Sequence, residues 1–287
     1  MTIIADSGST KTDWVLLNRD KGMESFSTNG LNPVLLDKAA IISEIGATFS
    51  KGSLSSKVNA VHFYGAGCFD EPHCTIVESA LQVIFPNASF WINNDLLAAA
   101  RAICGTSEGI ACILGTGANS CFFDGQKIVD NVPPLGYILG DEGSGTYLGK
   151  QLLRHYFYRE LPPELERRLL ADFSISKKKV IEAVYRQPNG NRYLANFAKW
   201  IIEQKKHPFV QQLLLNALDD FIKRQVLKYD RVREVPIHFI GSIAFFLQKE
   251  VKIVIEKNGL LLGKINRRPM EGLIKFHLQS SDFIEKL

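Results

Sequence analysis

The sequence lacks the features of secreted and membrane-spanning proteins. It holds five cysteines, an odd number with no CxxC pair, so no disulfide framework is indicated. No apolar run approaches the roughly 20 residues that span a bilayer. Asp6 also comes too soon in the first strand pattern for a signal peptide. We therefore expect reduced thiols, a cytoplasmic location and no membrane partner.

An excess of charge of one sign is also missing. The chain has 34 Lys and Arg against 30 Asp and Glu, which gives a formal net charge of +4 over 287 residues. Two short basic runs, at residues 177–179 and 205–207, are typical of solvated helix faces. The balance of charges predicts no nucleic-acid partner.

The first third of the chain alternates strand and helix patterns. The expected strands lie at about 2–6, 13–18, 23–28, 58–67 and 88–93, and the expected helices at about 37–49, 72–85 and 95–105. This order, an N-terminal hairpin followed by βαβα, predicts a largely parallel sheet that is covered by helices.

The same pattern restarts at residue 109. Residues 109–131 read as strand, Gly-rich turn, strand, Asp-Gly turn and strand, an order that echoes residues 2–28. The rest predicts mostly helices over 143–230, a strand at 235–241, a helix after Ser242, a short strand at 259–263 and a helix at 269–279. We therefore predict two similar sheets, each presenting a Gly-rich hairpin.

The first Gly-rich turn runs from Asp6 to Asp13 with the sequence DSGSTKTD. Glycine lets backbone N–H groups approach an anion closely, and the hydroxyl groups and Lys11 add donors. Two aspartates would repel a bare phosphate but suit one that is bound with a divalent cation. The turn is either a plain polar hairpin or a site for phosphate and metal.

Three further stretches carry glycine at positions where a ligand could approach. Gly115-Thr116-Gly117 leads into a strand, so it is a hairpin and not a dinucleotide-binding turn, which would open a helix. The stretch GSGTYLGKQ at 143–151 lacks the spacing of a P-loop. GDEGSG, at 140–145, has more glycine than a helix cap needs, and Gly241-Ser242 follows a strand where ligands bind in open α/β sheets.

Asp95 ends a strand and starts a helix. As a structural residue it would be the N-cap of that helix. As a functional residue it would be a general base that takes a proton from a hydroxyl group attacking a phosphate. Its position in the sequence leaves both interpretations open.

Together these stretches resemble the actin-like ATPase superfamily, and specifically the family of N-acetylglucosamine kinases and BadF/BadG/BcrA/BcrD ATPases. The resemblance lies in DSGSTKTDW, ILGTGANS, GYILGDEGSG and FIGS in this order, with NND at 93–95 between the first two. It implies an α/β, ribonuclease H-like fold with two lobes, each holding a mixed five-stranded sheet, and a cleft between them. The lobes would be residues 1–107, with a helix at about 269–287 packing back on them, and residues 108–268.

The resemblance also implies functions for individual residues. Asp95 would be the base for the 6-hydroxyl of an amino sugar, most simply N-acetylglucosamine, and Asp6 would organise Mg²⁺. The residues implied to bind ATP are Gly8, Ser9, Thr10, Lys11, Gly115, Thr116, Gly117, Gly241 and Ser242. Those implied to bind the sugar are Asn32, Gly65, Ala118, Asn119, Leu135, Gly136, Tyr137 and Asp141. The expected cofactors are ATP and Mg²⁺, the expected partner is the sugar, and we expect a homodimer.

Other functions stay open at this point. The same family includes ATPases that activate dehydratases and reductases through a shared iron–sulfur cluster, for which Cys112 and Cys121 are candidates that also suit core packing. N-acetylmuramate, glucosamine and glucose are alternative sugars. The zinc-binding cysteines of repressor-type glucokinases are missing from the pattern, and a sensor without turnover would carry the same motifs.

Overall fold

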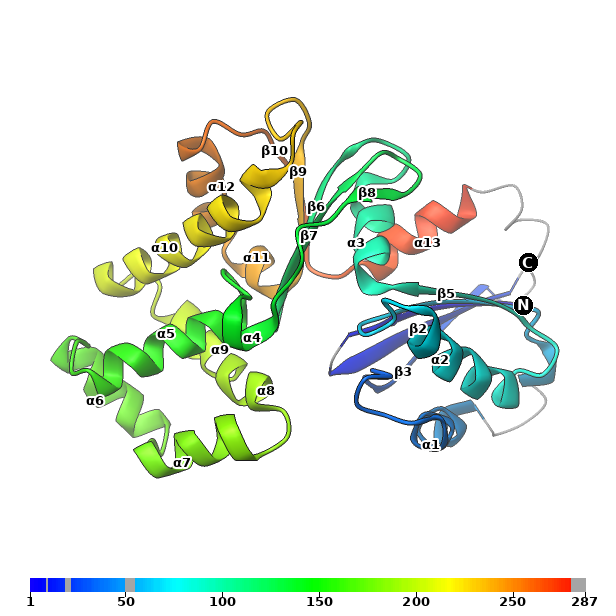
Figure 1. The fold of residues 1–287 in the computed structure, drawn as a ribbon, viewed down its shortest axis with the longest axis horizontal. Helices are drawn as coiled ribbons and strands as arrows, with labels where there is room; N and C mark the ends of the chain where they lie inside the picture. The colour runs from blue at the N-terminus through cyan, green and yellow to red at the C-terminus, as the bar shows by residue number, and fades with distance from the viewer. Residues whose placement is uncertain (9, 19–21, 50–54, 280–287) are drawn as a thin grey trace. The chain divides into compact units, whose positions relative to one another are not determined.

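The structure is a computed structural model that describes residues 1–8, 10–18, 22–49 and 55–279 (Figure 1). The chain divides into two compact units. Unit 1 consists of Met1–Ser107, Asp124–Ile128 and the C-terminal part from Arg268 onward. Unit 2 consists of Glu108–Phe123 and Val129–Arg267. Each unit is described by itself.

Unit 1 is built on a five-stranded sheet with the order β3-β2-β1-β4-β5. Its strands are β1 (Thr2–Ser7), β2 (Lys11–Asn18), β3 (Gly22–Asn29), β4 (Ala60–Gly65) and β5 (Ser89–Asn94). β1, β2 and β3 are antiparallel neighbours, whereas β4 and β5 continue the sheet in parallel with β1. All parallel strands therefore end at the same edge of the sheet.

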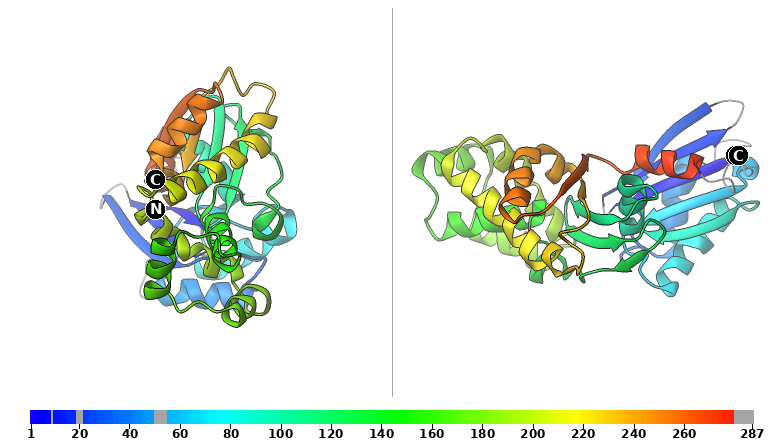
Figure 2. Two further views of the ribbon diagram at one scale, coloured as in Figure 1. Left: turned by 90° about the vertical axis from the view of Figure 1, so that its left-hand side faces the viewer. Right: turned by 90° about the horizontal axis from the view of Figure 1, so that it is seen from above.

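Helices cover both faces of this sheet. They are α1 (Lys38–Phe49), a 3₁₀ turn (Ser55–Lys57), α2 (Glu71–Ile84), α3 (Asp95–Cys104) and α13 (Met270–Leu278). Successive strand residues point to opposite faces, so Ile3 packs in the cluster with α1 and α2, and Ile4 in the cluster with α3 and α13. Figures 1 and 2 show α13 beside α3, and a side chain at Gly272 of α13 would lie 2.1 Å from the Ala102 carbonyl oxygen of α3.

Unit 2 contains the second five-stranded sheet, in the order β10-β9-β6-β7-β8. Its strands are β6 (Gly109–Leu114), β7 (Ala118–Phe123), β8 (Ile128–Asp130), β9 (Ile237–Ile240) and β10 (Leu262–Asn266). β6 is antiparallel to β7 and parallel to β9, which in turn is parallel to β10. The predicted α/β fold with two mixed five-stranded sheets is confirmed.

The last strand of unit 2 lies three residues later than predicted. The expectation was 259–263, but β10 begins at Leu262. Gly259 adopts a φ of +65°, and the Leu260 N–H donates to the Ile255 carbonyl at 3.1 Å. These residues therefore close the preceding helix α12 (Gln248–Lys257) before the strand can start.

The region predicted to be mostly helical forms the bulk of unit 2. It contains α4 (Gly136–Leu139), α5 (Gly145–Phe157), α6 (Pro163–Asp172), α7 (Lys177–Ile181), a π-helical turn (Glu182–Arg186), α8 (Gly190–Ala195), α9 (Phe197–Glu203), α10 (Pro208–Arg224) and a 3₁₀ turn (Val226–Lys228). α11 (Ser242–Phe246) follows β9 directly. One continuous core joins Leu114 of β6 to Leu148 of α5 and Leu214 of α10.

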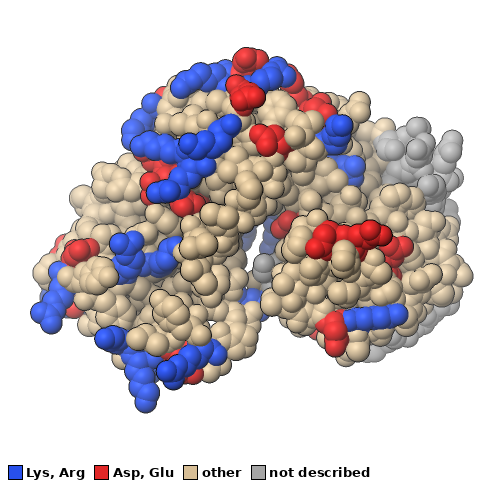
Figure 3. All heavy atoms as spheres, in the orientation of Figure 1, with Lys and Arg blue, Asp and Glu red and all other residues tan. Residues whose placement is uncertain are grey.

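Several surface charges of unit 2 have neighbours of the opposite sign. On the face shown in Figure 3, basic side chains lie among acidic ones, and Arg231 contacts Glu108 at 2.7 Å and Glu234 at 2.9 Å. Among the described residues, every helix is too short or too polar to cross a membrane.

Candidate active site

The described site residues that were predicted in unit 1 lie near one edge of its sheet. In the register of the parallel strands, Gly65 at the end of β4 lies beside Ser7 of β1 and Asn94 of β5. Asp95 follows immediately as the first residue of α3, and the turn from Gly8 to Lys11 leaves the same edge from β1. In open α/β sheets this carboxyl edge is where ligands bind.

The structure separates the two interpretations of Asp95. The N-cap of α3 is Asn94, whose Oδ1 accepts a hydrogen bond from the Leu97 N–H at 2.8 Å. The Asp95 carboxylate is therefore not needed as the cap. Burial raises its pKa to about 6, against hydrogen bonds from the backbone N–H groups of Leu96 and of Asp95 itself. A carboxylate with this pKa is suited to accept a proton near neutral pH.

Asp6 is the second acidic group at this edge. Burial, together with the nearby charges of Asp95 and Asp13, raises its pKa to about 7. Asp13 lies opposite Asp6 in the β1–β2 register. Carboxylates that repel one another in a partly buried place suit a divalent cation, because oxygen ligands of this kind are preferred by Mg²⁺. The role of Asp6 at a metal site stays a prediction, because the described residues contain no group of three His, Cys, Asp or Glu side chains that could hold a metal ion by itself.

Short-range hydrogen bonds hold the first Gly-rich turn. The Gly8 N–H donates to the Lys11 carbonyl at 3.0 Å, and the hydroxyl groups of Ser7 and Thr12 lie 2.8 Å apart. Lys11 Nζ contacts Asp13 Oδ1 at 2.5 Å and so is engaged within its own hairpin. Thr10 is exposed, and Ser9 lies outside the described residues.

Asn32 and Gly65 are placed by the loops next to this turn. Asn32 Oδ1 accepts a hydrogen bond from the Val34 N–H at 2.9 Å, which leaves its amide N–H₂ group for other partners. Gly67 has a φ of +90°, and a Cβ there would lie 2.2 Å from Asn32 Oδ1. At Gly65 a Cβ would collide with the Phe63 ring. These glycines thus allow two loops to approach each other and position Asn32.

The second Gly-rich hairpin, between β6 and β7 in unit 2, is held by a helix. At the start of α5, the N–H groups of Gly145 and Thr146 donate to the carbonyl oxygens of Gly115 and Thr116 at 2.9 and 3.0 Å. The Thr146 hydroxyl adds a bond of 2.5 Å to the same Thr116 oxygen. The first turn of α5 therefore fixes the backbone of Gly115-Thr116-Gly117.

Asp141 joins the same hairpin from the side. It adopts a φ of 60°, and its Oδ1 accepts a hydrogen bond from the Ala118 N–H at 3.1 Å. Burial raises the pKa of Asp141, and the Ala118 N–H and the Lys150 charge act against this rise. Asn119 Oδ1 accepts from Asn131 Nδ2 at 3.1 Å. The structure thus brings Ala118, Asn119 and Asp141 together.

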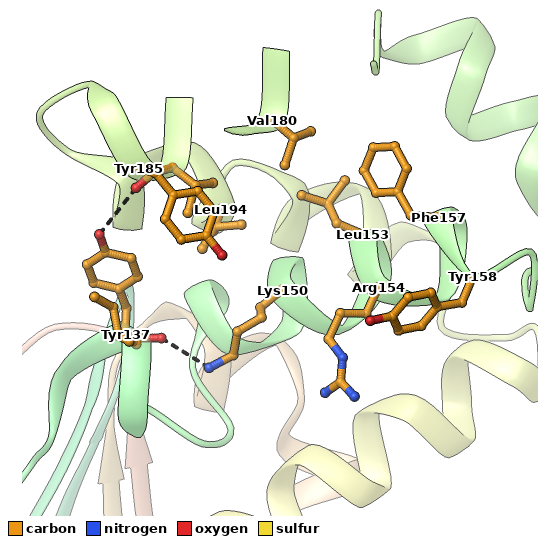
Figure 4. A pocket seen from close by; sticks show the side chains of 11 residues that line it. Tyr137, Lys150, Leu153, Arg154, Phe157, Tyr158, Val180, Tyr185 and Leu194 are labelled. Atoms are coloured by element: carbon orange, nitrogen blue, oxygen red, sulfur yellow. Dashed lines mark hydrogen bonds between the residues drawn. The ribbon is translucent and has the colours of Figure 1, made fainter. Parts of the chain in front are cut away.

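The other predicted sugar-binding residues of unit 2 lie at the start of α4. Leu135 precedes this short helix and is largely exposed, and Gly136 has a φ of +68°. Tyr137 points toward the π-helical turn, where its hydroxyl lies 3.5 Å from the Val184 carbonyl (Figure 4).

A cavity of about 500 Å³ connects the hairpin to Gly241-Ser242 within unit 2. Gly241 has a φ of +126°, and a Cβ there would lie 2.1 Å from the Leu114 carbonyl oxygen, so only glycine allows this contact. The lining residues are Gly115, Thr116, Gly145, Ala195, Ala198, Lys199, Ile202, Glu203, Ser242, Ile243, Phe246 and Arg267. Its volume suits a small-molecule ligand such as a nucleotide.

Sequence reasoning missed the helical wall of this cavity. Ala195, Ala198, Lys199 and Ile202 line it from α8 and α9. Their spacing of three and four residues predicts one face of a helix, but a face with small residues and one lysine is equally typical of ordinary packing. The tertiary contact with the hairpin is what distinguishes it.

Comparison with solved structures identifies the family. A crystal structure of a proposed N-acetylglucosamine kinase from Porphyromonas gingivalis matches with a TM-score of 0.91 and 44% sequence identity, over 98% of this chain and 99% of that chain. This chain belongs to the N-acetylglucosamine kinase family. It is thus a member of the actin-like ATPase superfamily and a kinase by class, as the four sequence stretches predicted.

Two more distant structures share the fold. A proposed N-acetylglucosamine kinase from Chromobacterium violaceum matches with a TM-score of 0.77 and 19% identity, over 96% of this chain and 98% of that chain. A ROK family glucokinase from Streptomyces griseus, in complex with glucose and AMPPNP, matches with a TM-score of 0.58 and 14% identity, over 98% and 99% of the chains. A scan against protein-family models and a search of the curated proteins give no match.

Proposed function

We propose that this family member is an ATP-dependent sugar kinase that phosphorylates the 6-hydroxyl of an amino sugar, with N-acetylglucosamine as the favoured substrate. The observation that carries the proposal is the position of Asp95 together with its raised pKa. Asp95 stands at the carboxyl edge of the unit 1 sheet with a raised pKa, while Asn94 provides the helix cap. The 44% identity to the Porphyromonas gingivalis protein supports N-acetylglucosamine as the sugar.

In this proposal unit 1 provides the acidic groups. Asp95 accepts the proton of the sugar hydroxyl as that oxygen attacks phosphorus, and one carboxylate suffices because phosphoryl transfer depends mainly on positioning and charge neutralisation. Asp6 would hold Mg²⁺, directly or through water. When bound, Mg²⁺ and ATP supply charge neutralisation and the transferable phosphoryl group.

Unit 2 provides donors for the nucleotide and the sugar. The hairpin Gly115-Thr116-Gly117 is held rigidly by α5, so the N–H groups of Thr116 and Gly117 and the Thr116 hydroxyl can face phosphate oxygens without reorganisation. The cavity that reaches Gly241-Ser242 would take the adenosine part. Sugar hydroxyl groups would bind the amide of Asn119 and the carboxylate of Asp141.

The test is an ADP-release assay with Mg·ATP and a panel of N-acetylglucosamine, N-acetylmuramate, glucosamine and glucose. We expect the highest kcat/KM with N-acetylglucosamine, and the product should carry phosphorus on O6 by proton–phosphorus NMR. The matched control is 6-deoxy-N-acetylglucosamine, which should bind without stimulating ADP release.

Two outcomes would contradict the proposal. Phosphorylation at another hydroxyl would reject the assigned regiochemistry. Failure of every sugar to stimulate ADP release would favour the activator-ATPase alternative, which an iron–sulfur absorption band in protein prepared without oxygen would support. Cys112 and Cys121 are both buried in strands of unit 2, where a cluster shared between subunits would not reach them without rearrangement.

A further inference from the structure

A second cavity in unit 2, of about 390 Å³, lies among α4, α5, the π-helical turn and α8. None of its lining residues is shared with the cavity beside Gly241-Ser242. Its volume falls in the range of about 300–1,000 Å³ that is typical of small-molecule sites. Its lining is Tyr137, Ile138, Lys150, Leu153, Arg154, Phe157, Tyr158, Val180, Val184, Tyr185 and Leu194.

The lining has two chemically different sides. In Figure 4, Val180, Leu153 and Phe157 lie on one side, and the charged ends of Lys150 and Arg154 lie on the other. Tyr185 projects from the π-helical turn and is 79% exposed. Single π-helical turns occur frequently at functional sites. The aromatic and aliphatic walls of the cavity could therefore contact the flat apolar part of a ligand, and the two cations could contact its polar end.

The two cations have no acidic partner in the part of the chain that the structure describes. Lys150 Nζ donates to the Tyr137 carbonyl at 3.0 Å and lies 5.1 Å from the centre of the Tyr147 ring, and Arg154 Nη1 donates to Gln151 Oε1 at 3.2 Å. The negative charges of Asp141 and Glu142 affect the pKa of Lys150, but neither carboxylate forms an ion pair with its amine. Like charges four residues apart on a helix repel each other, so an anion would stabilise this pair.

The cavity is mechanically connected to the phosphate-binding hairpin through α5. The first turn of α5 bonds to Gly115 and Thr116, and its third and fourth turns carry Leu153, Arg154 and Phe157. α8 links the two cavities in the same way, because Leu194 lines this one and Ala195 lines the other. Gly149 of α5 packs so closely on α8 that a Cβ would lie 1.9 Å from the Leu194 carbonyl oxygen. A shift of either helix would therefore change the shape of both cavities.

We propose that this cavity is an effector site for a small organic anion with a flat apolar body and a carboxylate or phosphate head. The head binds Lys150 and Arg154, and the body packs between Leu153, Phe157 and the side chains of the π-helical turn. Binding changes nucleotide affinity through α5 and the hairpin that it holds. The proposal goes beyond the kinase activity, since the anion is neither sugar nor nucleotide.

The test uses 2-naphthoate as the anion and 2-naphthamide as its neutral counterpart, titrated calorimetrically at pH 7.5. We expect 2-naphthoate to bind at least tenfold more tightly than the amide. Lys150→Met and Arg154→Gln should each weaken naphthoate binding at least fivefold and leave amide binding unchanged. Lys178→Gln removes an exposed lysine of α7 outside the lining and is the matched control, with no change expected. Val184→Trp should fill the cavity and abolish binding of both probes.

The effector role is tested by titrating AMPPNP with and without saturating 2-naphthoate. We expect the Kd of AMPPNP to change about fivefold or more in the wild-type protein and to stay constant in Val184→Trp. Three results would overturn the proposal: equal binding of naphthoate and naphthamide, displacement of naphthoate by N-acetylglucosamine, or an AMPPNP affinity that naphthoate leaves unchanged. None of these measurements needs turnover, so they remain decisive if the kinase assay fails. Circular dichroism confirms that each variant is folded.

Discussion

The two Gly-rich hairpins have similar strand patterns but are stabilised in different ways. The hairpin of unit 1 uses its own residues, with Ser7 bonded to Thr12 and Lys11 bonded to Asp13. The hairpin of unit 2 has a backbone bond from the Gly115 N–H to the Gly117 carbonyl at 3.0 Å and is otherwise held by the start of α5, while Gly241 packs against Leu114 beside it. Sequence similarity between two turns therefore does not imply that the same contacts support them.

The difference extends to the charges that surround each hairpin. The unit 1 hairpin lies near Asp6, Asp13 and Asp95, and burial together with the charges of the other two aspartates raises the pKa of Asp6. The unit 2 hairpin has one adjacent carboxylate, Asp141, which is bonded to a backbone N–H. This contrast suggests a division of functions, with proton transfer and metal binding in unit 1 and rigid phosphate contacts in unit 2.

The largest effect is expected at the acidic edge of unit 1. Asp95→Asn should lower kcat about 10²–10⁴-fold, because the amide cannot accept the hydroxyl proton. Binding of AMPPNP and of the sugar should change little, as measured by calorimetry. Asp70→Asn, which keeps the cap of α2 in the same unit, is the matched control with near-normal turnover expected. Near-normal turnover of Asp95→Asn would reject Asp95 as the base.

The next largest effect is expected where unit 2 supports its hairpin. Gly241→Ala introduces a Cβ that would lie 2.1 Å from the Leu114 carbonyl oxygen at a φ of +126°. We expect at least tenfold weaker AMPPNP binding together with a loss of about 3 kcal/mol or more in unfolding free energy. The control is Gly105→Ala, where φ is +67° and ψ is −119° and the new Cβ would have no atom within 4 Å; backbone strain should cost about 1–3 kcal/mol without affecting AMPPNP. Equal losses of AMPPNP affinity in the two variants would show that the steric contact at Leu114 is unimportant for nucleotide binding.

A smaller effect is expected on pH-dependent stability. The pKa of Asp6 is about 7 in the folded protein against an ordinary 3.8, so between about pH 4 and pH 7 the folded state keeps a proton that the unfolded state releases. Stability therefore falls as the pH rises through this range. Without metal or nucleotide, Asp6→Asn should raise Tm by about 2–4 °C at pH 8 and leave it unchanged at pH 4.5. A lower Tm for Asp6→Asn at pH 8 would contradict burial and repulsion as the causes. Turnover of Asp6→Asn should fall, because Asp6 is the residue proposed to hold Mg²⁺.

The smallest effect is expected from Lys11. Its amine is engaged by Asp13, and half-exposed ion pairs contribute about 0–1 kcal/mol. We expect Lys11→Met to lower stability by no more than this amount and to weaken AMPPNP about threefold at most. Isothermal titration and urea unfolding measure both values. A tenfold loss of AMPPNP affinity would instead show that Lys11 leaves Asp13 to contact phosphate.

Much of the fold could be predicted from the sequence because its signals are local. Alternating apolar residues predicted every strand of unit 1 to within a few residues, and DLLAAARAICG predicted α3 up to Gly105. β10 was misplaced because Leu260 is apolar yet belongs to the closing turn of α12. Apolar character alone does not distinguish a buried turn residue from a strand residue.

The candidate site was only partly accessible to such reasoning. Thr116 and Asp141 could be selected from their Gly-rich surroundings, but Lys199 and Ala198 carry no local signal of a cavity. Tyr137 follows Gly136 in the sequence, yet its side chain points to Val184. Neighbours in the sequence therefore need not face the same ligand.

The sequence by itself determined the two sheets, the family and the positions of the Gly-rich turns, because strand periodicity and glycine conformation act over a few residues. The tertiary structure decided that Asn94 caps α3, that Lys11 pairs with Asp13, and that α5 holds the second hairpin while Gly241 packs beside it. It also produced the cavity with Lys150 and Arg154. These features depend on side-chain direction and on contacts between segments far apart in the chain, which no local pattern specifies.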